Sequence, residues 1–279
     1  MSYKSLATFL TDPGTAELAL DAAIAVARQQ DAHLDVTGIG IDHTQPGFFY
    51  AGAPAIIYQE TIDQARAEAE ALEATARTRL SREDIRWSTE SGVAQLGGLT
   101  DLVAIRARFA DLVIQPRPYG EGRGHEAEAV VEAALFEGDA PVLVVPDSGL
   151  RPGFGRRVVV AWNQSAEALD AVRRALPLLI AADYVNVAVI DPPSHSPESA
   201  DPGGLVCRML VRHGVNAEVS VIARTMPTVS EMLCRHVRDQ DADMLVMGAY
   251  GHSRLREAIL GGATRNMLQI AEVPVFMAR

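Results

Sequence analysis

Lysine is almost absent from this chain of 279 residues: of its 25 lysines and arginines, all but Lys4 are arginine. A Walker-type phosphate loop needs a lysine after its glycines, and Schiff-base chemistry needs a reactive lysine amine. Lys4 precedes the first predicted strand and stands in neither context. The sequence therefore excludes both classes of site.

Cysteines and long apolar runs are also scarce. Cys207 and Cys234 are the only cysteines and form no CxxC pair, so the sequence suggests neither a disulfide framework nor a thiolate zinc site. The segment MSYKSLATFL lacks the apolar core of a secretory signal. The most apolar stretch, 175–190, is interrupted by a proline and by polar residues, so no segment is expected to span a bilayer. We expect a cytoplasmic protein in a reducing compartment, with no membrane partner.

Basic residues are fewer than acidic ones: 25 lysines and arginines against 36 aspartates and glutamates give a net charge of 25 − 36 = −11 at pH 7. Because no cluster of arginines offsets this charge, a nucleic acid partner is not expected. Hydrophobic residues make up 48% and charged residues 22%, which is typical of a globular protein. At ~150 residues per domain, the length predicts two domains.

The two halves of the chain repeat one another. Residues 110–114 (ADLVI) are echoed by residues 242–246 (ADMLV), and the segment APVLVV at 140–145 is echoed by VPVFMA at 273–278. The offsets are 132 and 133, so the spacing between the two motifs is kept. The first half carries extra residues near 43–58, which we interpret either as a lid or partner surface or as a loop packed on its own domain.

Each half alternates short apolar runs with amphipathic stretches, the pattern of a parallel sheet covered by helices. The predicted strands are 5–10, 34–41, 85–90, 110–115 and 141–145, then 156–161, 184–190, 216–222, 243–247 and 273–277. The predicted helices are 14–30, 59–80, 95–108 and 126–137, then 166–181, 201–213, 226–240 and 263–271. We predict two tandem α/β domains, 1–147 and 156–279, each a doubly wound five-stranded parallel sheet of order 3-2-1-4-5.

Four glycines follow the fourth predicted strand of the second half, in the segment MGAYGHSRLREAILGGATRNML at 247–268: Gly248, Gly251, Gly261 and Gly262. Ligands of open parallel sheets lie at the carboxyl ends of the strands beside the switch point. Thr264 stands at the start of the next helix, where unpaired amide groups and the positive dipole end suit phosphate oxygens.

The spacing Gly248, two residues, Gly251, nine residues, Gly261 resembles the nucleotide-binding signature of the universal stress protein family. The whole chain looks like a tandem, UspA-like member that carries this motif only in its second half. The resemblance implies flavodoxin-like (HUP-like) domains paired through their last strands as a pseudo-dimer. It also implies ATP or ADP as ligand, with or without Mg²⁺, and little or no catalysis.

The resemblance assigns site residues by position. Ala161, Trp162 and Asn163 would flank the adenosine, and the backbone of Val189 would meet the adenine. The remaining contacts, to ribose and phosphates, would come from Met247, Gly248, Gly251, His252, Gly261, Gly262, Ala263 and Thr264. ATP-binding members usually have Ser or Thr where this chain has Gly262, and Asp where it has Asn163. Loss of one hydroxyl hydrogen bond, ~1 kcal/mol, would weaken binding several-fold without abolishing it.

The first half departs further from the motif. At the equivalent positions it has Pro116, which has no amide to donate, and Glu132, which would repel phosphate at a helix start. We interpret this half as a degenerate copy. Its own glycines, at 120, 122 and 124, leave a loop for another ligand open.

Other polar residues have simpler interpretations. His252 and Ser253 could form a catalytic pair, but Ser253 is better placed as a helix cap. Asp241 and Asp243 lie at the amino end of a strand, away from the site edge, which favours a turn role over a carboxylate dyad. Arg265 could contact phosphate or lie on the surface.

Three functions remain open. The first is a stress-response regulatory protein that binds ATP or ADP in its second domain and acts through protein partners that the sequence does not identify. The second is a nucleotide-independent interaction module, and the third a slow ATPase, adenylyl-transferring or flavin-linked enzyme on the same scaffold. A tandem chain already contains a pseudo-dimer, and a homodimer of such chains is a further alternative.

Overall fold

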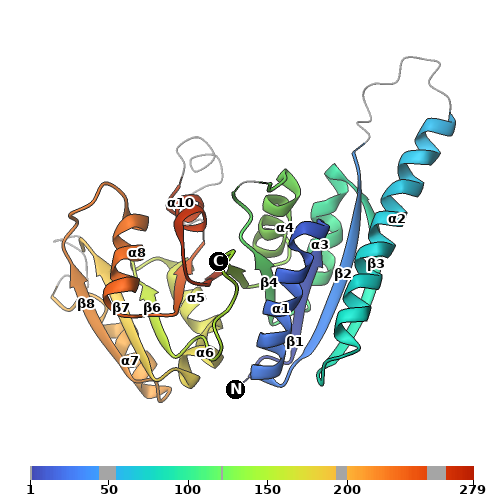
Figure 1. Ribbon diagram of the computed structural model, residues 1–279. Coiled ribbons are helices and arrows are strands. Elements are labelled where there is room, and N and C mark those ends of the chain that lie inside the picture. The colour runs from blue at the N-terminus through green and yellow to red at the C-terminus, as the bar shows by residue number, and fades with distance from the viewer. Residues whose placement is uncertain (1, 44–54, 121, 193–199, 250–261) are drawn as a thin grey trace. The chain divides into compact units, whose positions relative to one another are not determined.

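The computed structural model describes residues 2–43, 55–120, 122–192, 200–249 and 262–279 (Figure 1). The chain divides into two compact units: an N-terminal unit, Tyr3–Ala140, and a C-terminal unit, Pro141–Arg279, to which residues Met1–Ser2 are also assigned. Both units are α/β and mostly parallel, as the sequence predicts. Among the described residues, no helix is long and apolar enough to cross a membrane.

The N-terminal unit is built on four parallel strands in the order β3-β2-β1-β4. These are β1 (Ser5–Leu10), β2 (His33–Asp42), β3 (Arg86–Gln95) and β4 (Leu112–Pro116). The helices that connect or follow them are α1 (Pro13–Gln30), α2 (Ala55–Leu80), α3 (Leu99–Ala107) and α4 (His125–Phe136). Asp12 caps α1 by accepting a hydrogen bond from the Gly14 amide at 2.9 Å.

Helix α2 packs unusually close to β2, along which it runs (Figure 1). A Cβ atom at Gly40 would lie 1.7 Å from the Ala65 carbonyl oxygen, and one at Gly38 would lie 2.7 Å from the Ala69 carbonyl oxygen. Only glycine therefore fits at these two positions of the strand.

The C-terminal unit has the strand order β8-β7-β6-β9-β10-β5. The strands are β5 (Val142–Val145), β6 (Arg157–Ala161), β7 (Tyr184–Ile190), β8 (Ala217–Ile222), β9 (Met244–Gly248) and β10 (Val275–Ala278). Strands β6 to β10 are parallel, and β5 pairs antiparallel with β10, with Val144 opposite Val275. The helices are α5 (Ala166–Arg174), α6 (Leu176–Ala181), α7 (Gly204–Arg212), α8 (Val229–Asp239) and α10 (Ala263–Ile270).

An aspartate anchors the first strand of each repeat. Asp111 Oδ2 accepts hydrogen bonds from the amides of Lys4 and Ser5, at 2.6 and 3.0 Å. Asp243 occupies the equivalent place and accepts from the amides that begin β6, with Oδ1 lying 3.2 Å from the Arg157 nitrogen. Asp241 adopts a left-handed turn at φ 50°. Both aspartates of the 241–243 pair therefore lie at the amino end of β9, as expected for a turn role.

The structure corrects some predicted boundaries. The helix predicted at 166–181 is two helices, because Pro177 lacks an amide hydrogen and its ring would clash with an uninterrupted helix. The strand predicted at 85–90 continues to Gln95, and α3 begins only at Leu99, after Gly97 and Gly98.

The strand predicted at 141–145 is β5, Val142–Val145, which pairs antiparallel with β10 and is grouped with the C-terminal unit. Most of the extra segment near 43–58, and the cap assigned to Ser253, lie outside the described residues.

Candidate functional site

A cavity of about 290 Å³ opens in the C-terminal unit where β6, β7 and β9 end and where α8 and α10 begin. It lies beside the switch point between β6 and β9, the usual ligand position in open parallel sheets. Its lining consists of Ala161, Trp162, Asn163, Ser165, Ala188, Ile190, Val229, Ser230, Leu233, Met247, Gly248, Ala263, Thr264 and Met267. We call it the C-terminal pocket.

A tight turn after β6 shapes one side of the C-terminal pocket. The Trp162 amide donates to the Ala188 carbonyl at 2.9 Å and so ties the end of β6 to β7. Asn163 Oδ1 accepts from the Ser165 amide at 3.1 Å, and Ser165 Oγ in turn caps α5 by accepting from the Ala168 amide. The side-chain oxygen of Asn163 is thus used by the turn, and the side-chain nitrogen of this exposed residue is a donor that a ligand could use.

Gly248 ends β9 directly under the first turn of α5. A Cβ atom there would lie 2.6 Å from the Ala168 nitrogen and 2.7 Å from the Glu167 carbonyl carbon. Real side chains do not approach backbone so closely, so glycine is required for α5 to pack on β9. Gly248 lines the pocket, but the packing of α5 on β9 alone explains why this residue is glycine, whether or not a ligand binds.

The start of α10 forms another side of the C-terminal pocket. Gly262 is the N-cap residue, at φ −54° and ψ 160°, and no side chain caps the helix. The first amides of any α-helix have no carbonyl acceptor four residues earlier in the same helix, and no acidic residue stands in the first turn of α10. Ala263 and Thr264 line the pocket, and Thr264 is 3% exposed. Such a helix start attracts anions.

Alternate side chains of β7 face the C-terminal pocket. Ala188 and Ile190 line the pocket, whereas the Val189 side chain lies on the opposite face, where a Cβ atom at Gly203 would be 3.0 Å from its Cγ2. Of the other predicted residues, Gly251, His252 and Gly261 lie outside the described residues. Arg265 is exposed on α10 and is not part of the lining.

Sequence reasoning missed seven lining residues, and three of them, Val229, Ser230 and Leu233, come from α8; the others are Ser165, Ala188, Ile190 and Met267. A signal for this helix start was present: Thr228 and Glu231 form a capping box, in which each side chain accepts from the other's amide.

A buried polar cluster fastens α8 to the sheet. His236 Nε2 lies 2.8 Å from Asn186 Oδ1, and the fully buried Asn186 donates from Nδ2 to Tyr184 and Ser220. Because Asn186 Oδ1 accepts, the His236 proton is on Nε2 in the neutral ring. Burial lowers the pKa of His236 below its usual 6.5. The neutral imidazole therefore helps to hold the helix that forms one pocket wall.

None of the lining side chains that the structure describes carries a charge. The polar groups are the amide of Asn163 and the hydroxyls of Ser165, Ser230 and Thr264; the rest of the wall is mainly apolar. No carboxylate or imidazole in this lining could activate a hydroxyl or hold a metal ion. The described surface suits the binding of a neutral, flat group beside an anion at the α10 start.

Residues 155–279, which contain every lining residue of the C-terminal pocket, match the model of the Universal stress protein family. A universal stress protein of Synechocystis sp. is 25% identical to this chain over 124 residues, which are 44% of this chain. The match spans 42% of that relative's length.

Some of the similar solved structures cover almost the whole chain. A universal stress protein from Archaeoglobus fulgidus matches 98% of this chain and 96% of its own, with a TM-score of 0.75 and 14% identity. A functionally unknown protein from Pseudomonas aeruginosa matches 99% of this chain and 92% of its own, with a TM-score of 0.62 and 15% identity. At these identities the likeness concerns the fold.

Proposed function

We propose that this chain is a tandem universal stress protein that binds ATP or ADP in the C-terminal pocket as a regulatory ligand. One observation carries the proposal. The lining of the C-terminal pocket includes seven residues to which the family resemblance assigns nucleotide contacts: Ala161, Trp162, Asn163, Met247, Gly248, Ala263 and Thr264.

The chemistry of the lining supports an adenine nucleotide. An uncharged wall of Trp162, Ile190, Met247 and apolar neighbours accepts a neutral base without desolvating a charged side chain. The amides at the start of α10 would receive the phosphates. Mg²⁺ would bind through the phosphates, because no lining carboxylate is among the described residues.

Binding without catalysis fits the same lining, since phosphoryl transfer requires charged groups around the transferred phosphate. Nucleotide occupancy would then act by changing the affinity for a protein partner. The antiparallel pair of β5 and β10, which are the last strands of the two sequence repeats, supports the tandem part of the proposal.

The test is isothermal titration of the full chain with ATP, ADP and adenosine in the presence of Mg²⁺, comparing Ala263→Glu with Ala263→Gln. Ala263 is exposed in the first helical turn, where an acidic residue favours the helix, so both variants should fold. A carboxylate ~5 Å from a phosphate charge is repelled by ~3 kcal/mol at an effective dielectric constant of ~20.

Allowing for solvent screening, we expect ATP to bind at least ~10-fold more weakly to the glutamate variant than to the glutamine variant. Adenosine should bind both variants equally. If the native protein binds none of the three ligands at millimolar concentration, nucleotide binding is wrong and the interaction-module alternative gains support.

A further inference from the structure

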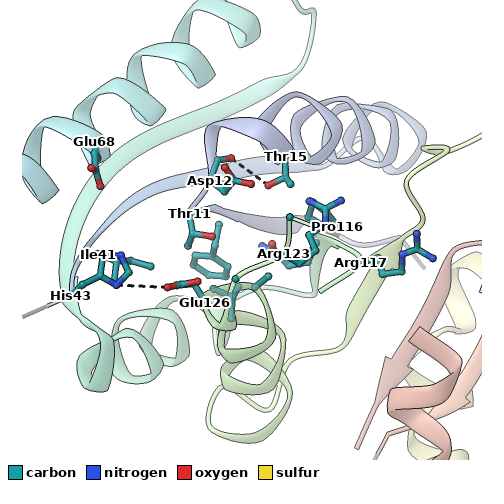
Figure 2. A pocket seen from close by; sticks show the side chains of 16 residues that line it. Thr11, Asp12, Thr15, Ile41, His43, Glu68, Pro116, Arg117, Arg123 and Glu126 are labelled. Atoms are coloured by element: carbon teal, nitrogen blue, oxygen red, sulfur yellow. Dashed lines mark hydrogen bonds and ion pairs between the residues drawn. The ribbon is translucent and has the colours of Figure 1, made fainter. Parts of the chain in front are cut away.

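Charged side chains occupy the exposed features of the N-terminal unit. Its cavity of about 220 Å³, at the carboxyl ends of β1 and β4, is lined by carboxylates and guanidinium groups, among them Glu68, Glu126 and Arg117 (Figure 2). Its edge strand β3 carries Arg86 and Glu90, each of which takes part in an ion pair. Charges on an edge strand discourage another strand from pairing with it. The outer edge of the C-terminal unit differs in this respect.

Strand β8 forms that outer edge and pairs, among the described strands, with β7 alone (Figure 1). Its sequence, AEVSVI, contains no proline and no basic residue. Its one charged side chain, Glu218, accepts a hydrogen bond from the Tyr184 hydroxyl on β7. The main-chain groups on the outer side of β8 therefore form a row that another strand can pair with.

A mainly apolar groove runs beside this edge, on the face of the sheet that α7 covers. Its volume is about 390 Å³, and one flank of α7 forms it together with Val219 of β8. Cys207 belongs to this flank, and its Sγ lies 3.4 Å from the Ala217 carbonyl oxygen. Val211 of the same flank is 55% exposed, and Val221, on the same face of β8 as Val219, is 58% exposed. Adjoining exposed apolar side chains of this kind are typical of an interaction surface.

The edge of β8 is complementary to itself. When two β8 strands pair antiparallel about a two-fold axis at Val219, the two Val219 side chains lie opposite each other and Ala217 lies opposite Val221. On the other face of the strands, Glu218 lies opposite Ser220, so that no like charges are directly opposed.

The charges at the two ends of α7 are complementary in the same arrangement. A two-fold axis perpendicular to the sheet reverses the direction of α7, so the two α7 helices run antiparallel to each other. Asp201 just before the helix then lies toward the last turn of the other α7, which carries Arg212. Both residues are exposed and line the groove. The pairing of two copies therefore brings opposite charges together at both ends of the contact.

We propose that two copies of this chain associate through antiparallel pairing of their β8 strands, with their α7 grooves facing each other across a two-fold axis at Val219. The pairing satisfies the outer main-chain groups of both strands and covers the exposed side chains of Val211 and Val221. No residue of the groove lines the C-terminal pocket, so the association does not require nucleotide.

The test is sedimentation velocity of the full chain without nucleotide. We expect the native protein to form a dimer and Val219→Lys to raise its dissociation constant at least ~100-fold, because two ammonium groups would meet on the axis. Val93→Lys is the matched control: Val93 is 37% exposed on the edge strand β3, and this variant should dimerise like the native protein. A native protein that is monomeric at ~100 μM, or a dimer that Val219→Lys leaves intact, would overturn the proposal.

Mixed variants test the position of the axis. Val219→Asp alone should be as monomeric as Val219→Lys alone, whereas an equimolar mixture of the two places opposite charges on the axis and should restore the dimer. A mixture that stays monomeric would overturn the pairing about Val219. If Val219→Lys does not fold, as judged by circular dichroism, Val221→Lys introduces the charge at a position that is 58% exposed. A Val221→Lys protein that still dimerises like the native one would contradict the proposal.

Discussion

Replacing Gly248 with alanine separates a packing role from a ligand role. The added Cβ atom would lie 2.6 Å from the Ala168 nitrogen, 0.8 Å inside the 3.4 Å at which ordinary contact begins. The obstacle is the backbone of α5, which cannot rotate away as a side chain can. Overpacking of this kind costs ~1–3 kcal/mol, so we expect the melting temperature to fall by roughly 3–9 °C.

The assay is thermal unfolding of the nucleotide-free protein, followed by circular dichroism. Gly262→Ala is the matched control, since φ −54° at Gly262 is open to any residue and only a small N-cap effect should appear. A Gly248→Ala protein that melts within ~1 °C of the native one would refute the packing argument and return Gly248 to a purely ligand-related role.

The remaining predictions use the same unit. Burial lowers the pKa of His236, so its contribution to the free energy of unfolding should be fully present above the usual pKa of 6.5 and should decline as the pH falls below that value. The His236→Gln variant, which can still donate to Asn186, should show a smaller decline in urea unfolding between pH 5 and 8. An unchanged decline would show that another group is responsible. Asp243→Ala removes acceptors from the amides that begin β6 and should cost ~2 kcal/mol in urea unfolding, whereas a loss no larger than that of Asp241→Gly would contradict the anchoring role. Gly262→Ser adds a hydroxyl that can donate to a phosphate oxygen and should raise ADP affinity several-fold in calorimetry (~1 kcal/mol); unaltered or weaker affinity would place the phosphates away from this residue.

The sequence predicted the alternation of strands and helices because apolar periodicity directly reflects burial on a parallel sheet. It also predicted the edge of the sheet at which Ala161, Met247 and Thr264 meet, since carboxyl ends of parallel strands share one edge. Gly248 was correctly placed at this edge, but the backbone that requires glycine, the first turn of α5, is brought there only by tertiary packing.

Other features depend on long-range contacts that periodicity does not encode. The apolar run of β5 predicts a strand, but its antiparallel pairing with β10 is implied only by the family resemblance and not by periodicity. The contribution of α8 to the C-terminal pocket could not be predicted, because the sequence does not show which helix packs on β7.

The central claim, nucleotide binding in the C-terminal pocket, can be tested most directly with the protein's two tryptophans. Trp162 lines this pocket, whereas Trp87 lies on β3 of the N-terminal unit. In a Trp87→Phe variant, ATP should change the Trp162 emission in a saturable way, with the same midpoint that calorimetry gives. Calorimetric binding of ATP without any change in Trp162 emission would place the nucleotide elsewhere, and absence of both signals would contradict the account.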